Sequence, residues 1–301
     1  MRYSFFSRSV VAFGLFVLVG SLSLSAASPV RATGSDPQLL SEDFKFTEGP
    51  IADRQGNVYF TDQPNNRIMV WTVEGKLETF LQPSGRANGL YFDLQGNLLA
   101  CADEKNQLWQ ISPDKDVTVL VENLDGNLLN GPNDLWVDPN GGIFFTDPFY
   151  KRDYWDRSEK QIAQENVYYM PPNRSGLRIA ATELVRPNGI VGTPDGKKLY
   201  VADISARKTY VFEIGSNGEL KNRQLFVEMG SDGMTIDEKG NLYLSGRGVT
   251  VFNSNGEKID EIPIDEGWTA NVCFGGRDRD TLFVTAMDSL YAVKMKVKGT
   301  E

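Results

Sequence analysis

The sequence contains no histidine. This absence excludes Ser-His-Asp and Cys-His catalytic relays, imidazole general bases, and histidine-liganded zinc or non-haem iron sites. Motifs of the CxxC, GxSxG, P-loop and dinucleotide-binding types are also missing. Any catalysis by this chain therefore depends on carboxylates, amides and a hard cation.

Cysteine and positive charge are both scarce. The chain has 2 Cys, 31 Lys and Arg, and 40 Asp and Glu, which gives a formal net charge of −9. An acidic surface argues against nucleic acids and anionic membranes as partners. Cys101 and Cys273 fall on strands of different repeats, so we expect two buried thiols rather than a disulfide.

A helical pattern is absent everywhere except near the N-terminus. There, arginines flank an apolar run from about Val10 to Leu24 that is followed by small residues, the layout of a secretory signal peptide. The alternative is a membrane anchor, but the run is shorter than the roughly 20 apolar residues that a spanning helix needs. We therefore expect a signal peptide over residues 1–32, with cleavage after Ala27 or Ala32. The mature protein would be periplasmic or extracellular and free of the membrane.

The rest of the chain consists of repeated strand patterns. Each unit has an apolar strand, a Gly-containing turn and a second strand rich in Val, Leu, Tyr and Phe, and further strand segments follow. Six such units, spaced roughly 40 to 55 residues apart, predict an all-β, six-bladed β-propeller with four-stranded blades. We expect one domain over residues 37–299. The sixth unit has only three strands, so Leu39–Phe46 is predicted to complete the last blade and close the circle.

In every repeat, a polar residue stands just ahead of a short apolar run and a turn. These residues are Glu48, Asn88, Asn133, Asn188, Asp232 and Asn271. Radial repetition places equivalent positions at equal height around one axis, so their oxygen atoms should converge. Such a ring suits Ca²⁺, or Mg²⁺ and Mn²⁺ if waters fill the open positions. The alternative is that the Asn-Gly and Asp-Gly pairs only form turns, although each repeat already has a hairpin turn about eight residues later.

Five motifs together resemble one known family. They are EGP at Glu48, GPNDLWVD around Asn133, RPNGI at Asn188, DGMTID at Asp232 and NVCFGG at Asn271. In this order they resemble the SMP-30/gluconolactonase/LRE-like family, and the resemblance extends from about Leu39 to Val297. It implies a six-bladed propeller with one divalent cation in the tunnel, usually Ca²⁺, with Mg²⁺, Mn²⁺ or Zn²⁺ as alternatives. Matched by motif, its ligands are Glu48, Asn133, Asn188 and Asp232.

The resemblance implies an enzyme that hydrolyses a small sugar-type lactone. The cation would polarise the ring carbonyl and help a water molecule lose its proton. Asp232 is the candidate general base; the alternative is that it serves only as a ligand. Two other functions stay open. One is phosphotriester hydrolysis at the same calcium site, as in diisopropyl-fluorophosphatase-like proteins, and the other is a non-catalytic propeller that binds a partner.

Substrate contacts are expected from residues near the tunnel mouth. Asn88 and Asn271 complete the ring and bind either substrate hydroxyls or the backbone at strand starts. Animal members of the family have Arg where this chain has Gly131. Arg86 is therefore the candidate replacement, provided that its loop faces the tunnel mouth.

The third repeat carries an extra segment, Asp147–Glu165, between its second and third strands. Loops on a rigid scaffold often determine specificity. Tyr150 and Trp155 in this segment could form an aromatic wall for a cyclic substrate. The alternative is a charged surface loop whose aromatic side chains pack on neighbouring blades.

Overall fold

The computed structural model describes Met1, Ser4 and residues 28–300. The predicted signal peptide falls mostly outside these residues, and it stays a prediction. In the described part of the chain, no helix combines the length and the apolar character needed to cross a bilayer.

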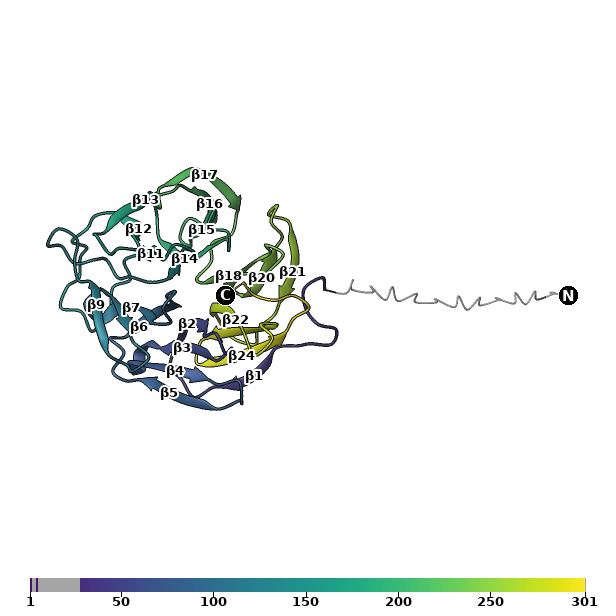
Figure 1. Ribbon diagram of the computed structural model, residues 1–301. Coiled ribbons are helices and arrows are strands. Elements are labelled where there is room, and N and C mark those ends of the chain that lie inside the picture. The colour runs from purple at the N-terminus through teal and green to yellow at the C-terminus, as the bar shows by residue number, and fades with distance from the viewer. Residues whose placement is uncertain (2–3, 5–27, 301) are drawn as a thin grey trace.

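Six four-stranded antiparallel sheets surround a central axis (Figure 1). The first blade contains β2 Thr47–Ala52, β3 Val58–Asp62, β4 Arg67–Trp71 and β5 Leu77–Leu81. The second contains β6 Ala87–Phe92, β7 Leu98–Ala102, β8 Gln107–Ile111 and β9 Val117–Val121. The third contains β10 Leu135–Val137, β11 Ile143–Asp147, β12 Glu165–Met170 and β13 Arg178–Leu184.

The remaining blades repeat this arrangement. The fourth contains β14 Pro187–Gly192, β15 Lys198–Asp203, β16 Lys208–Ile214 and β17 Leu220–Val227. The fifth contains β18 Met234–Ile236, β19 Leu242–Gly246, β20 Gly248–Phe252 and β21 Lys258–Ile262. The sixth combines β22 Thr269–Gly275, β23 Thr281–Ala286, β24 Ser289–Lys294 and the N-terminal β1 Gln38–Ser41. Two short 3₁₀ helices, η1 Gln63–Asn65 and η2 Asp103–Lys105, follow β3 and β7. The predicted six-bladed propeller is confirmed.

The N-terminal strand closes the circle as predicted. Strand β1 pairs antiparallel with β24, with Leu39 opposite Tyr291. It ends at Ser41, however, rather than at Phe46. The reason lies in the first blade, where the carboxylate of Asp62 accepts hydrogen bonds from the backbone N–H groups of Lys45 and Phe46. These residues are therefore held against the first blade and do not continue the strand.

A separate set of aspartates builds the hairpin turns between the first two strands. Asp53, Asp93, Asp138 and Asp237 each accept, through Oδ1, the backbone N–H groups of the residues two and four positions later. Side chains that satisfy nearby backbone donors in this way are typical of turns. The six polar residues of the predicted ring lie outside these turns, so the hairpins do not require them.

Apolar side chains fill the space between neighbouring blades. In β7, for example, every residue is buried, and Cys101 in this strand forms no disulfide with the buried Cys273 of β22. The expected pair of buried thiols is confirmed. Close packing is visible at Gly192, where an added Cβ would lie 2.3 Å from the indole of Trp136.

Residues just before the propeller are also anchored to it. Val30 is 1% exposed and packs into the core shared by the fifth and sixth blades, and its carbonyl accepts the Lys296 N–H at 2.7 Å. Arg31 forms an ion pair with Asp260, with 2.9 Å between Nε and Oδ2. Of the two predicted cleavage positions, only the one after Ala27 leaves these contacts in the mature chain.

A chain that begins at Ser28 should therefore be more stable than one that begins at Thr33. Burial of a valine side chain contributes about 1.5–3 kcal/mol, so the free energy of unfolding should fall by about that amount in the shorter chain. Urea unfolding of both chains measures the difference, and Val30→Ala in the longer chain should reproduce part of it. Equal midpoints for both chains would show that this segment adds nothing to the fold.

Candidate active site

One cavity at the mouth of the central tunnel collects most of the predicted ring. Its volume is about 440 Å³, and it is lined by Glu48 from β2, Asn88 from β6, Asn133 before β10, Asn188 from β14 and Asp232 before β18. All except Asp232, which is partly buried, are buried. The sixth ring residue, Asn271 of β22, lines a smaller space shared with the inner strands. The structure thus brings together five residues from five blades.

Glycines let the inner strands approach one another closely enough to form the ring. A Cβ added at Gly89 would lie 2.5 Å from the carbonyl oxygen of Asn133 and 2.7 Å from the Cα of Asp134. At Gly49, an added Cβ would lie 2.3 Å from the carbonyl oxygen of Asn88. Because these neighbours are backbone atoms, they cannot move aside as a flexible side chain would. Glycine after Glu48 and after Asn88 is therefore a packing requirement.

Asp232 is held by two hydrogen bonds, one on each carboxylate oxygen. Asn188 Nδ2 donates to Oδ1 at 2.7 Å, and Trp268 Nε1 donates to Oδ2 at 2.6 Å. Asn188 Nδ2 also donates to the hydroxyl of Tyr150 at 2.9 Å. The amide nitrogen of Asn188 is thus committed to protein partners. Its carbonyl oxygen makes no hydrogen bond to another described residue, so this oxygen is available to a ligand.

The ring holds two carboxyl groups, and the charge of Asp232 disfavours ionisation of Glu48. Burial, followed by the nearby Asp232, raises the pKa of Glu48 well above its usual range. Burial also raises the pKa of Asp232 to about 6, against the opposing effects of its two hydrogen bonds and of the charge of Arg152. Neither carboxylate forms an ion pair with a Lys or Arg of residues 28–300. Buried carboxylates require such compensation, which a cation would supply.

The donor set of the ring fits a hard cation. The four predicted ligands offer two carboxylates and two amide groups, so every donor is an oxygen. Oxygen ligands of this kind suit Ca²⁺, whereas Zn²⁺ favours nitrogen and sulfur. No group of three or more His, Cys, Asp or Glu side chains in the described part of the chain has an arrangement for metal binding. The amide oxygens of Asn133 and Asn188 must therefore complete any cation site here.

Two residues near this ring were missed in the sequence. Asp134, directly after Asn133, is buried; burial raises its pKa to about 7, and its Oδ2 lies 3.5 Å from Asn271 Nδ2. An acidic residue directly before the apolar residues LWV could have indicated a buried carboxyl group at this position. Trp268, which donates to Asp232, lies in the loop before β22. No repeated pattern marks this position.

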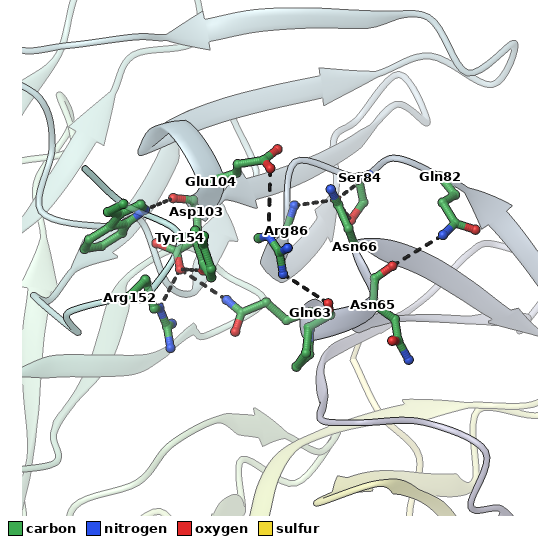
Figure 2. A network of polar contacts seen from close by, with 12 residues as sticks. Gln63, Asn65, Asn66, Gln82, Ser84, Arg86, Asp103, Glu104, Arg152 and Tyr154 are labelled. Carbon is green, nitrogen blue, oxygen red and sulfur yellow. Dashed lines mark hydrogen bonds and ion pairs between the residues drawn. The ribbon is translucent and has the colours of Figure 1, made fainter. Parts of the chain in front are cut away.

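Only some of the residues predicted to contact substrate line this cavity. Tyr150 and Asn88 both line the cavity. Arg86 is not among the lining residues; its Nη1 donates to the carbonyl of Pro64 at 3.0 Å, and its guanidinium faces Glu104 (Figure 2). Trp155 lines a second cavity on the side of the third blade's extra segment. A role for Arg86 and Trp155 in substrate binding stays a prediction.

A family model for the SMP-30/gluconolactonase/LRE-like region matches residues 46–288. The chain belongs to this family. A gluconolactonase from Zymomonas mobilis is 30% identical over 292 residues, which cover 87% of this chain and 82% of that protein. The solved structure of a gluconolactonase from Xanthomonas campestris has a TM-score of 0.82 and 28% identity, and covers 88% of this chain and 91% of that one.

A more distant structure shares the fold. Regucalcin from Agrobacterium tumefaciens, described as a calcium-binding protein, has a TM-score of 0.74 and 18% identity, and covers 88% of this chain and 95% of that one. At this identity the likeness shows the propeller and nothing more. The two gluconolactonase relatives support a hydrolase of the lactonase kind.

The glycine requirement is testable at Gly89. We expect Gly89→Ala to lower the free energy of unfolding by about 1–3 kcal/mol, because the new Cβ would press on the backbone of the third blade. Gly267→Ala is the matched control, since an added Cβ there meets nothing within 4 Å. Chemical unfolding of both variants gives the comparison. A Gly89→Ala protein as stable as the control would contradict the close approach of the inner strands.

Proposed function

We propose that this chain is an exported, cation-dependent lactonase that opens the ring of a sugar-type lactone. One observation carries the proposal: the cavity at the tunnel mouth is lined by the carboxyl groups of Glu48 and Asp232 and by several amide groups, and neither carboxyl group forms an ion pair with a Lys or Arg of residues 28–300. Membership of the family and the gluconolactonase relatives support the reaction type. The apolar N-terminal segment supports export.

Glu48, Asn133, Asn188 and Asp232 would hold the cation, and Ca²⁺ fits this all-oxygen donor set best. When bound, a divalent cation polarises a carbonyl oxygen and makes a nearby water more acidic. Within the protein, Asn188 and Trp268 fix the orientation of the Asp232 carboxylate through hydrogen bonds of 2.7 and 2.6 Å. A carboxylate fixed in this way at the cavity wall is suited to accept a proton from the attacking water.

Other residues of the cavity would orient the substrate. Tyr150 donates or accepts at its hydroxyl, which already receives a hydrogen bond from Asn188. Asn88 lines the cavity, and its carbonyl oxygen accepts the hydroxyl of Thr61 at 3.0 Å. This hydrogen bond fixes the backbone at Asn88. Asn88 is therefore part of a rigid section of the cavity wall.

Replacement of Asp232 should separate its role as a base from its role as a ligand. At cation concentrations that keep the site filled, we expect Asp232→Asn to lower kcat by about 10²–10⁴, the usual loss when a general base is removed. Steady-state kinetics together with elemental analysis of the same sample give the result. Near-normal turnover with the cation bound would assign deprotonation of water to the cation instead.

A substrate panel tests the reaction type. In a pH-stat assay, the purified protein should open aldonolactones faster than homoserine lactones, aryl esters or diisopropyl fluorophosphate. Faster release of fluoride than opening of any lactone would favour the phosphotriesterase function. No turnover of any of these compounds by cation-loaded protein would favour a non-catalytic binding propeller.

A further inference from the structure

The extra segment between β11 and β12 brings one cationic side chain into the cavity. Arg152 is the single Lys or Arg among the described residues that line it. Its Nε donates to Asp103 Oδ2 at 2.7 Å, and its side chain is 24% exposed. The terminal nitrogens of Arg152 make no hydrogen bond to any residue of the described chain. Their N–H groups are thus free to bind a molecule in the cavity.

Asp103 fixes the extra segment in place. Its Oδ2 accepts hydrogen bonds from Arg152 Nε, from the hydroxyl of Tyr154 at 2.6 Å and from Gln63 Nε2 at 3.3 Å (Figure 2). Its backbone carbonyl also accepts Trp155 Nε1 at 2.8 Å. One buried residue of the second blade therefore contacts three side chains of the third blade's extra segment. This places Arg152 with little freedom to move.

The second blade differs from other blades at this point. In the first and fourth blades an aspartate, Asp62 or Asp203, ends the second strand and accepts backbone N–H groups from the loop ahead of the ring residue. In the second blade Ala102 occupies the same paired position, and Asp103 follows one residue later. The Asp103 carboxylate consequently accepts hydrogen bonds from the extra segment and not from the backbone of the loop ahead of Asn88.

The surroundings of Gly131 show that Asp103 and the extra segment leave no space for a side chain at this position. A Cβ added there would lie 2.9 Å from Asp103 Oδ1 and 3.1 Å from the Trp155 ring. A side chain at position 131 would therefore collide with the docked segment. The extra segment contributes Tyr150 and Arg152 to the cavity lining, whereas residues 130–132, which precede Asn133, contribute none.

We propose that Arg152 binds the hydroxyl oxygens of a sugar lactone and makes the cavity selective for polyhydroxylated rings, with Asp103 as its positioning residue. This role rests on the lactonase function proposed above. A guanidinium offers only N–H donors, in a fixed planar fork that matches neighbouring oxygens. Because Asp103 already immobilises Arg152, little additional ordering is needed when substrate binds.

Two lactones with the same ring size test the role of Arg152: glucono-δ-lactone, which carries hydroxyls, and δ-valerolactone, which has none. We expect Arg152→Met to lower kcat/KM for glucono-δ-lactone by about 10- to 100-fold, the effect of losing hydrogen bonds to a charged group. Its kcat/KM for δ-valerolactone should stay near the wild-type value. Lys151→Met is the matched control, because Lys151 is exposed and does not line the cavity.

Asp103→Asn provides the second variant. It preserves the size of the side chain but replaces an acceptor facing Arg152 Nε with a neutral amide, so KM for glucono-δ-lactone should rise while kcat changes less. An equal loss on both lactones, or no loss on either, would overturn the selectivity role of Arg152. A wild-type protein that opens neither lactone would instead refute the lactonase function, and this failure is visible before any substitution is made.

Discussion

Two carboxyl groups, that of the buried Glu48 and that of the partly buried Asp232, share one cavity, and neither forms an ion pair with a lysine or arginine of the described residues. Burial makes the charged form of each unfavourable, and their proximity adds repulsion. The fold must therefore hold these groups together against their own electrostatics. A divalent cation held by these residues would offset that repulsion, so the same two carboxyl groups suit a cation site.

The propeller supplies the rigidity that such a site needs. Each ring residue lies on, or directly before, the inner strand of a different blade. Contact between backbones at Gly49 and Gly89 fixes the spacing of these strands. Strand β1 completes the last blade, so the circle is joined by hydrogen bonds between the two ends of the fold. Functional groups on closed, paired strands are held more accurately than groups on loops.

Much of this arrangement could be predicted from the sequence, because the repeat period fixes the number of blades and the place of the ring residue in each repeat. The features outside the repeat could not. The contribution of Trp268 depends on the path of a loop, and the docking of the extra segment depends on Asp103 lying one residue beyond the paired position of Ala102. Likewise, β1 ends early because Asp62, distant in sequence, binds the backbone at Lys45. Such contacts follow from the tertiary structure and leave no local pattern.

The most direct test of the cation-dependent site is a calcium titration of protein stripped with EDTA, with lactone hydrolysis followed in parallel. Calorimetry should show one saturable site, because the four predicted ligands line a single cavity. Hydrolysis should be lost on stripping and return in proportion to the occupancy of that site. Full activity in stripped protein, or the absence of saturable binding by Ca²⁺ and by other divalent cations, would contradict the account.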